Sequence, residues 1–428
     1  MLLRPKVLVT RKIPDRGINF LKTQCDVDVS QQNGSISRKE LLKKLKSKKY
    51  DALLCLLTDK IDDEILDAAG SNLKIVANYA VGFDNIDLKA CTERGVIVTN
   101  TPNVLNQAVA EHTVALMMAI ARRIPEADKW ARKGNYKGWD PNGFIGTEFN
   151  GKTLGIIGAG RIGTVVARIC NKGFNMKVLY HDINKNPFIE QEANARFADM
   201  ATLLRESDFV SLHVPALEST KHMINHKELA MMKKTAYLIN TARGPVIQED
   251  ALLHALENKT IAGAALDVFE CEPKLVCHPN EYQIFTHLDN IVISPHIASA
   301  TIEARQGMSE LAAKNIIAVL NGEMPITQVN TDLKVNAIKK GIVTDAANYF
   351  YARNGMVVKN LTELQSALEK MDDSTFNFHV NANKNDFVNW IRNTIKDQVA
   401  VALLEKAKTR SQAVNAIKHR LKVMIVAY

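Results

Sequence analysis

Three residues of the chain, Arg243, Glu272 and His296, each follow an apolar or β-branched run, and their types can do acid–base or anion-binding chemistry. An imidazole can donate a proton, and a carboxylate on its other ring nitrogen can orient it and favour its charged form. A guanidinium can grip a carboxylate through planar donors. Together they suit the reduction of a 2-keto acid, with His296 as the acid, Glu272 as its partner and Arg243 as the substrate anchor.

Each of these residues also has an ordinary structural interpretation. A lone arginine after a strand often forms a surface ion pair, an acid before proline often belongs to a turn, and a single histidine is more often structural than catalytic. Catalysis is favoured because all three follow expected strands and lie downstream of a dinucleotide fingerprint. In an open parallel sheet, ligands bind at the carboxyl ends of the strands.

The fingerprint is the segment "TLGIIGAGRIG", a short apolar run that leads directly into a helix-like stretch. Its first glycine permits a tight turn, its second lets backbone approach a pyrophosphate, and its third allows close packing of helix on strand. The helix N-terminus then offers free N–H groups to the phosphates. The predicted cofactor loop comprises Gly158, Gly160, Arg161, Ile162 and Gly163.

A second strand, "KVLYHD", ends in Asp182, about 20 residues beyond the fingerprint, where an acid accepts the ribose hydroxyls of NAD. Asp182 therefore favours NADH over NADPH, although the nearby Lys185 could soften that preference.

Strand-like and helix-like segments alternate in two blocks, over residues 1–102 and again to about residue 297. Such alternation predicts open, doubly wound parallel sheets with helices on both faces. The apolar-periodic stretch 103–128 predicts a long helix, and residues 300–320 predict another that ends at Asn321-Gly322.

The bulk composition is that of an ordinary globular chain, with 46% hydrophobic and 24% charged residues. No apolar run reaches the ~18–20 residues of a membrane span, and no signal peptide is recognised, so the cytoplasm is the expected location. The six cysteines form no C-x-x-C pair and are expected to be free thiols, with no metal site. The net charge of +9 is dispersed, so nucleic acid is not an expected partner.

At its motifs the sequence resembles the D-isomer-specific 2-hydroxyacid dehydrogenases, most of all their glyoxylate/hydroxypyruvate reductase branch. The resemblance covers about residues 1–330 and rests on stretches such as "VANYAVGFDNID", "GKTLGIIGAGRIG", "INTARG", "ALDVFECEP" and "SPHIASAT". It implies reduction of a small 2-keto acid, glyoxylate or hydroxypyruvate, to the D-2-hydroxy acid with NAD(P)H.

The resemblance also implies a division of the chain. Residues 1–102 and 299–332 would form a discontinuous, flavodoxin-like substrate domain, residues 103–298 a Rossmann cofactor domain, and residues 333–428 a small, mostly α-helical domain of unknown role. A cleft would lie at the junction of the first two. Members are usually homodimers, with the helix near 103–124 and the loop around Trp139 at the interface.

Further site residues are implied by the resemblance. It repeats Arg243, Glu272 and His296 as the catalytic set, with Arg243 and His296 also contacting substrate. The remaining substrate contacts would be Leu57, Val81 and Gly82. The remaining cofactor contacts would be Val214, Pro215, Thr241 and Asp267.

Some positions depart from related patterns and narrow the substrate. Asn103 and Asn106 differ from the residues that relatives often carry near the hinge. Glu272 argues against a formate dehydrogenase, which pairs its histidine with glutamine. Asn78 stands where phosphoglycerate-specific relatives tend to carry arginine. A dehydrogenase for 3-phosphoglycerate, D-lactate or another D-2-hydroxy acid nevertheless stays open, as does an NAD-sensing corepressor-like binding protein, since such relatives keep the same triad.

The tail 333–428 contains no residue that the dehydrogenase motifs need. Its segments 361–371 and 411–424 predict helices, and an aromatic stripe of Phe376, Phe378, Phe387 and Trp390 is expected to form the core of a small domain. The tail is similar to a small uncharacterised prokaryotic domain. A protein partner or a regulatory role is the hypothesis for it.

Overall fold

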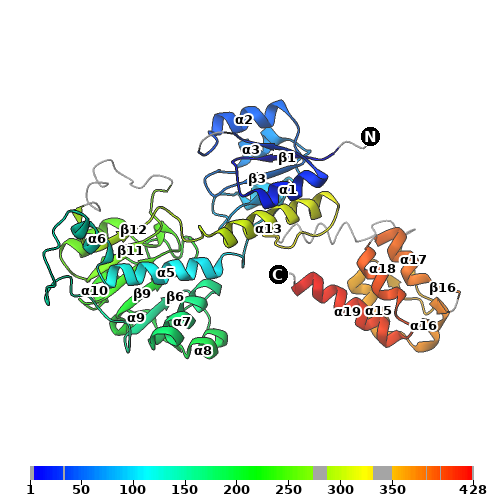
Figure 1. Cartoon of the computed structure of the whole chain (residues 1–428). Coiled ribbons are helices and arrows are strands. Elements are labelled where there is room, and N and C mark those ends of the chain that lie inside the picture. The colour runs from blue at the N-terminus through cyan, green and yellow to red at the C-terminus, as the bar shows by residue number, and fades with distance from the viewer. Residues whose placement is uncertain are drawn as a thin grey trace.

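The computed structural model describes residues 4–31, 34–272, 287–330, 349–381, 383–395 and 397–426. These residues form two parallel sheets flanked by helices, together with a small helical unit at the C-terminal end (Figure 1). The predicted α/β fold class is therefore confirmed.

The first sheet has the strand order β2-β1-β3-β4-β5, and all of its pairings are parallel. Helices between successive strands give it the doubly wound character that the alternation predicts. The strands are β1 (Lys6–Val9), β2 (Asp26–Val29), β3 (Ala52–Cys55), β4 (Ile75–Asn78) and β5 (Ile97–Thr99), and the helices are α1 (Asp15–Gln24), α2 (Arg38–Ser47), α3 (Asp63–Ala69) and α4 (Leu88–Glu93).

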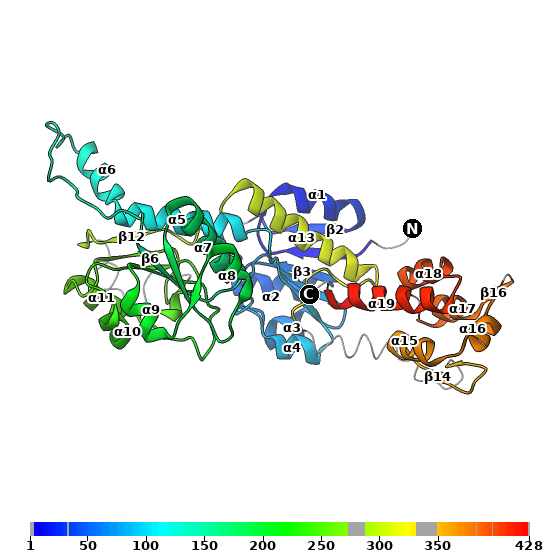
Figure 2. The ribbon, with the colours of Figure 1, turned by 90° about the horizontal axis from the view of Figure 1, so that it is seen from below.

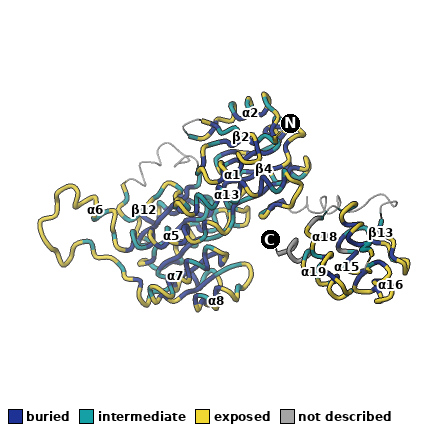
Figure 3. Tube along the Cα trace, turned by 45° about the vertical axis from the view of Figure 1, so that its right-hand side comes forward, coloured by how far each residue is buried: buried dark blue, intermediate teal, exposed yellow. Residues whose placement is uncertain are grey.

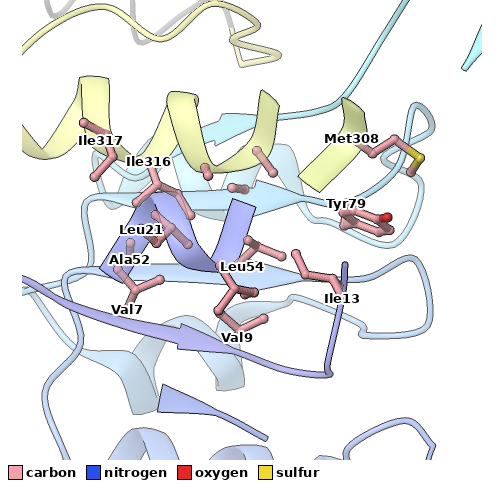
Figure 4. Packing of buried hydrophobic residues seen from close by; sticks show 14 of the residues in the cluster. Val7, Val9, Ile13, Leu21, Ala52, Leu54, Tyr79, Met308, Ile316 and Ile317 are labelled. Atoms are coloured by element: carbon pink, nitrogen blue, oxygen red, sulfur yellow. The ribbon is translucent and has the colours of Figure 1, made fainter. Parts of the chain in front are cut away.

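The long helix α13 (Ile302–Leu320) returns from the second sheet to cover the first, where it packs against α1 (Figures 1 and 4). Ile316 lies in one buried cluster with Leu21 of α1 and with Leu54 of β3. The two helices approach so closely that a Cβ on Gly17 would lie 2.1 Å from the carbonyl oxygen of Ser309. The helix ends before Gly322, as predicted, at a left-handed φ of 78°.

The second sheet has the strand order β12-β11-β10-β9-β6-β7-β8, again all parallel. Chain order runs outward in both directions from β6, so the switch point lies between β6 and β9. Its strands are β6 (Thr153–Ile157), β7 (Lys177–His181), β8 (Arg196–Phe197), β9 (Phe209–Leu212), β10 (Tyr237–Asn240), β11 (Gly263–Leu266) and β12 (Ile291–Ile293), and its helices are α7 (Arg161–Phe174), α8 (Pro187–Ala193), α9 (Met200–Glu206), α10 (His226–Met231) and α11 (Glu249–Glu257).

The helix expected over 103–128 is two helices, α5 (Asn106–Ala121) and α6 (Ile124–Arg132). Arg123 between them is left-handed, at φ 52°, and Pro125 then opens α6. Helix α5 packs on α7 and on β10 and β11, whereas α6 has no buried residue. Figure 2 shows α6 and the loop after it projecting from the body, and Figure 3 shows the same segment largely exposed.

The C-terminal unit has a hydrophobic cluster of its own. Three members of the predicted aromatic stripe, Phe376, Phe387 and Trp390, are buried in it, but Phe378 is 44% exposed, so the stripe was wrong at that position. Its elements are β13 (Phe350–Tyr351), β14 (Val357–Val358), α15 (Leu361–Lys370), α16 (Asp373–His379), β15 (Val380–Asn381), β16 (Lys384–Asn385), α17 (Asp386–Trp390), a π-helical turn (Ile391–Ile395), α18 (Gln398–Glu405) and α19 (Arg410–Val426).

His379 in this unit is a structural residue. Its Nε2 accepts the backbone N–H of Arg353 at 3.0 Å, so its Nδ1 carries the hydrogen and donates to Asp386 at 3.0 Å. The buried ring thereby ties the β13–β14 hairpin to helices α16 and α17.

The cysteines follow the prediction only in part. Cys25, Cys55, Cys91 and Cys170 are buried free thiols, as expected, but Cys271 is disulfide-bonded, so the prediction of a free thiol was wrong there. Within the described part of the chain no group of residues could hold a metal ion, and no helix has the length and apolarity to cross a membrane.

Candidate active site

The glycine loop joins β6 to α7 at the carboxyl edge of the second sheet. Gly158 has φ 97°, and a Cβ there would lie 2.7 Å from the backbone of His213, so only glycine fits the turn. A Cβ on Gly163 would lie 2.3 Å from the carbonyl oxygen of Gly158. At Gly160 nothing lies within 4 Å, so this glycine leaves open space in front of the N-terminus of α7.

Asp182 lies directly beside this loop. Its Oδ2 accepts the N–H of Ala159 at 2.7 Å, and its Oδ1 accepts the N–H of Ile183 at 2.7 Å. The ammonium of Lys185 lies over the ring of Phe197, 5.6 Å from its centroid. Open space at a helix N-terminus, with a carboxylate at the next strand end, fits the pyrophosphate and ribose of a nicotinamide dinucleotide.

Glu272 and His296 meet across the ends of β11 and β12. Nδ1 of His296 lies 2.6 Å from Oε2 of Glu272, and Oε1 of Glu272 accepts the N–H of Phe269 at 2.9 Å. The carboxylate therefore holds one ring nitrogen, while Nε2 has no partner among the described residues. Both side chains are about three-quarters buried, with exposed fractions of 28% for His296 and 26% for Glu272. This arrangement can present Nε2 as a proton donor.

The backbone around His296 is unusual, since the residue is left-handed at φ 53°. A non-glycine residue in this region is strained by about 1–3 kcal/mol and must be held by its surroundings. Its N–H donates to the carbonyl of Asp267 at 2.8 Å, and the next two N–H groups, of Ile297 and Ala298, donate to the Asp267 carboxylate at 2.9 and 2.8 Å. Asp267 thus fixes the segment that carries His296.

The Asp267 carboxylate, whose side chain is fully buried, also accepts from Ser294 Oγ at 2.6 Å and lies 3.4 Å from Nε2 of His112. Burial alone would raise the pKa of Asp267, but hydrogen bonds from His112, Ser294 and two backbone N–H groups lower it, so the net shift is downward from 3.8. The carboxylate is therefore ionised at neutral pH.

Two residues at this edge were missed from the sequence, and both lie on α5. His112 lies 3.0 Å from Ser294 Oγ, and Thr113 Oγ1 lies 2.8 Å from Thr241 Oγ1. The "EHT" triplet that contains them lies in a mostly apolar helix. Polar residues on a buried helix could have indicated contacts with the site.

Arg243 follows β10, and its guanidinium contacts the loop after β10 in the second sheet and the loop after β4 in the first. Nη1 donates to the carbonyl of Ala242 at 2.7 Å, and Nε donates to Asp84, on the loop after β4, at 3.2 Å. A Cβ on Gly82 would lie 1.7 Å from Nη2, so the free edge of the guanidinium lies against Gly82. Sequence reasoning placed Arg243 and Gly82 together but missed Asp84.

The other expected contacts follow the carboxyl ends of strands in both sheets. Val214 and Pro215 follow β9, Thr241 follows β10, and Leu57 follows β3 with 38% of its surface exposed. Val81 precedes Gly82, and its carbonyl accepts from Asn100 Nδ2 at 2.8 Å. His213, which lies behind the glycine loop, is no competitor for the acid role, because burial lowers its pKa to about 3.

Comparisons with known proteins identify the family of this chain. The profile of the D-isomer specific 2-hydroxyacid dehydrogenase NAD binding domain matches residues 114–298. A glyoxylate reductase of Thermofilum pendens is 53% identical over 343 residues, which cover 79% of this chain and 98% of the relative.

Solved structures of related enzymes share the fold. The NADPH-dependent glyoxylate/hydroxypyruvate reductase of Sinorhizobium meliloti, in complex with NADP and malonate, is 29% identical with a TM-score of 0.65 and aligns over 76% of this chain and 97% of its own. The D-lactate dehydrogenase of Aquifex aeolicus, complexed with NAD and lactic acid, is 30% identical with a TM-score of 0.67 and aligns over 76% and 99%. The chain belongs to the D-isomer-specific 2-hydroxyacid dehydrogenase family.

Proposed function

We propose that this dehydrogenase reduces glyoxylate to the achiral glycolate, or the similarly small hydroxypyruvate to its D-2-hydroxy acid, and prefers NADH. The observation that carries the proposal is the 2.6 Å contact between His296 and Glu272, at the same sheet edge as the glycine loop. The 53% identity to a named glyoxylate reductase supports the choice of substrate.

In this proposal each side chain has one task. Arg243, with the backbone around Val81 and Gly82, binds the substrate carboxylate and sets the carbonyl carbon within reach of the cofactor. When bound, the reduced nicotinamide supplies the hydride for that carbon. Nε2 of His296 gives its proton to the carbonyl oxygen, and Glu272 stabilises the cationic ring before transfer.

A substrate panel tests the proposal. Purified full-length protein is mixed with NADH or NADPH and with glyoxylate, hydroxypyruvate, pyruvate, phosphohydroxypyruvate or 2-oxoglutarate, and the absorbance of the reduced cofactor is followed. We expect the highest kcat/KM for glyoxylate or hydroxypyruvate with NADH. A higher value for pyruvate or phosphohydroxypyruvate would favour the D-lactate or 3-phosphoglycerate alternative. If no acid in the panel caused oxidation of NADH or NADPH, the proposed reductase activity would be rejected.

The cofactor preference rests on Asp182. Its carboxylate is fixed beside Ala159, where it can accept ribose hydroxyls but would repel a 2′-phosphate. In Asp182→Ala we expect the ratio of kcat/KM for NADH to that for NADPH to fall by about 10-fold or more, since tenfold corresponds to only about 1.4 kcal/mol. Lys185→Ala is the companion variant, and we expect it to leave the ratio unchanged because the ammonium lies over Phe197. An unchanged ratio in Asp182→Ala would contradict the assignment.

The projecting segment of α6 and its loop supports a homodimer. It exposes five large apolar side chains, and so much apolar surface on one arm is typical of a protein interface. They are Ile124, Trp130, Tyr136, Trp139 and Ile145, with Trp139 84% exposed. Sedimentation of the full chain should give twice the mass of one chain.

We propose a partner-binding or regulatory role for the C-terminal unit, since its core is separate from those of the two sheets. A glyoxylate reductase of Thermococcus litoralis is matched over 98% of its length by 77% of this chain, which is about 330 residues. A chain that ends at Asn330 should therefore keep kcat and KM within about twofold in the basal assay, while the full chain alone retains a partner in a pulldown. If the truncated chain bound a partner as well as the full chain does, the proposed role of the C-terminal unit would be wrong. A partner that recruits a DNA-bound complex would favour the corepressor-like alternative.

A further inference from the structure

The side chain of Arg243 is held by a carboxylate that belongs to the other sheet. Asp84 lies on the loop after β4, and its Oδ1 accepts from Nε of Arg243 at 3.2 Å. Arg243 is the more buried partner, with 26% of its side chain exposed against 55% for Asp84. The pair therefore joins the carboxyl ends of β4 and β10.

The loop that carries Asp84 is braced on both sides by asparagine side chains. Asn78 Nδ2 donates to the carbonyl of Gly82 at 2.8 Å and to Oδ1 of Asn85 at 3.0 Å. Asn85 in turn donates to the carbonyls of Leu56 and Asp59 at 3.1 and 3.0 Å. Because these bonds fix the backbone on either side of Asp84, its carboxylate is presented from a defined position.

The two anchors leave one orientation for the guanidinium. Nε is used by Asp84 and Nη1 donates to the carbonyl of Ala242 at 2.7 Å, so Nη2 is turned toward Gly82. A guanidinium has five N–H donors, and three remain once Asp84 and Ala242 are bonded, including both on Nη2, which lies beside Gly82. Without Asp84, the bond from Nη1 to the Ala242 carbonyl would remain as the one anchor described here, and the guanidinium could pivot about it, which would spread these donors over several directions.

We propose that Asp84 is a positioning residue, which orients Arg243 so that its Nη2 edge binds the substrate carboxylate. This inference rests on the proposed function and extends it, because it assigns the carboxylate-binding geometry to an ion pair between the two sheets. Asp84 itself does not contact the reacting atoms.

The test compares Asp84→Ala with Asp84→Asn in the full-length holoenzyme. Asparagine keeps an oxygen that can accept from Nε, whereas alanine does not. We expect Asp84→Ala to raise the KM for glyoxylate and the Kd for oxamate, an unreactive carboxylate, by about 10-fold, the loss of one charge-assisted hydrogen bond. We expect Asp84→Asn to restore most of the loss, with the Kd for NADH and the Tm unchanged in both variants.

A double-mutant cycle separates positioning from an independent effect. If Asp84 acts through Arg243, adding Asp84→Ala to Arg243→Ala should cost nothing further in oxamate binding, because coupled residues are not additive. Asp63→Ala, which removes an exposed carboxylate paired with Arg94 in the same sheet region, is the matched control and should behave as wild type. Additive losses, or Asp84→Ala with wild-type KM and oxamate affinity, would overturn the inference.

Failure of the proposed function gives a different pattern. If wild-type protein binds oxamate with NADH present but reduces no 2-keto acid, the proposed function fails and the cycle still decides the role of Asp84. If wild-type holoenzyme binds no oxamate, Asp84 has no carboxylate site to serve and the inference fails as well.

Discussion

Replacing His296 by alanine should lower kcat for glyoxylate by about 10²–10⁴-fold, the range for loss of a positioned general acid. In the structure Glu272 engages one ring nitrogen of His296, and the other ring nitrogen has no partner among the described residues, so it can serve the substrate. The Kd for NADH should stay within about twofold, because the glycine loop and Asp182 lie on other strand ends. Stopped-flow absorbance gives kcat, and quenching of protein fluorescence gives the Kd.

His254→Ala is a matched control, since His254 is exposed on α11 and lies away from this sheet edge. Glu272→Gln provides a graded case, because glutamine keeps a hydrogen-bond acceptor for Nδ1 but removes the charge that stabilises the cationic ring. We expect its loss of kcat to be smaller than that of His296→Ala and to grow as the pH rises. A His296→Ala variant with a kcat within threefold of wild type would contradict the general-acid role.

The parts predicted from the sequence are those with strong local signals. Apolar runs separated by helix-like stretches predicted both parallel sheets, and Asn321-Gly322 predicted the end of α13. Arg243, Glu272 and His296 could be named because each lies within a few residues of the end of an expected strand, and parallel strands bring their carboxyl ends to one edge. Sequence periodicity therefore predicts which residues share an edge but not how their side chains pair.

Most of the features that the sequence did not predict depend on contacts between residues far apart in the chain. Helix α1 and strand β2 went unrecognised, because "DVDV" is a short edge strand with alternating charge. The break at Arg123 interrupts the apolar period of this stretch, and Pro125 was the local signal for it, but the left-handed backbone of Arg123 is what separates the two helices. Asp84 and Asp267 act on residues far away in the chain, Arg243 and the segment after His296, and no local pattern marks such pairings.

The second large expected effect is on cofactor binding by the glycine loop. Gly158 and Gly163 are required by the fold, whereas Gly160 leaves open space for the ligand. In the protein without ligand, a methyl group on Gly160 would meet nothing within 4 Å, and the residue has φ −75°, so alanine should fold there without strain. The same methyl would occupy the space through which the backbone must approach a pyrophosphate. Gly160→Ala should therefore keep its Tm within a few degrees while the Kd for NADH rises by about 10–100-fold.

Two neighbouring glycines of the same helix separate this steric effect from a general effect of alanine. Gly173→Ala also meets nothing within 4 Å but lies at the far end of α7, so it should bind NADH normally and gain up to about 1 kcal/mol of stability from better helix propensity. Gly163→Ala would place its Cβ 2.3 Å from the Gly158 carbonyl oxygen and should lose about 1–3 kcal/mol of stability. Calorimetric titration with NADH and thermal unfolding measure both quantities. If Gly160→Ala bound NADH as tightly as Gly173→Ala does, the pyrophosphate could not lie against Gly160, and the N-terminus of α7 would lose its proposed role.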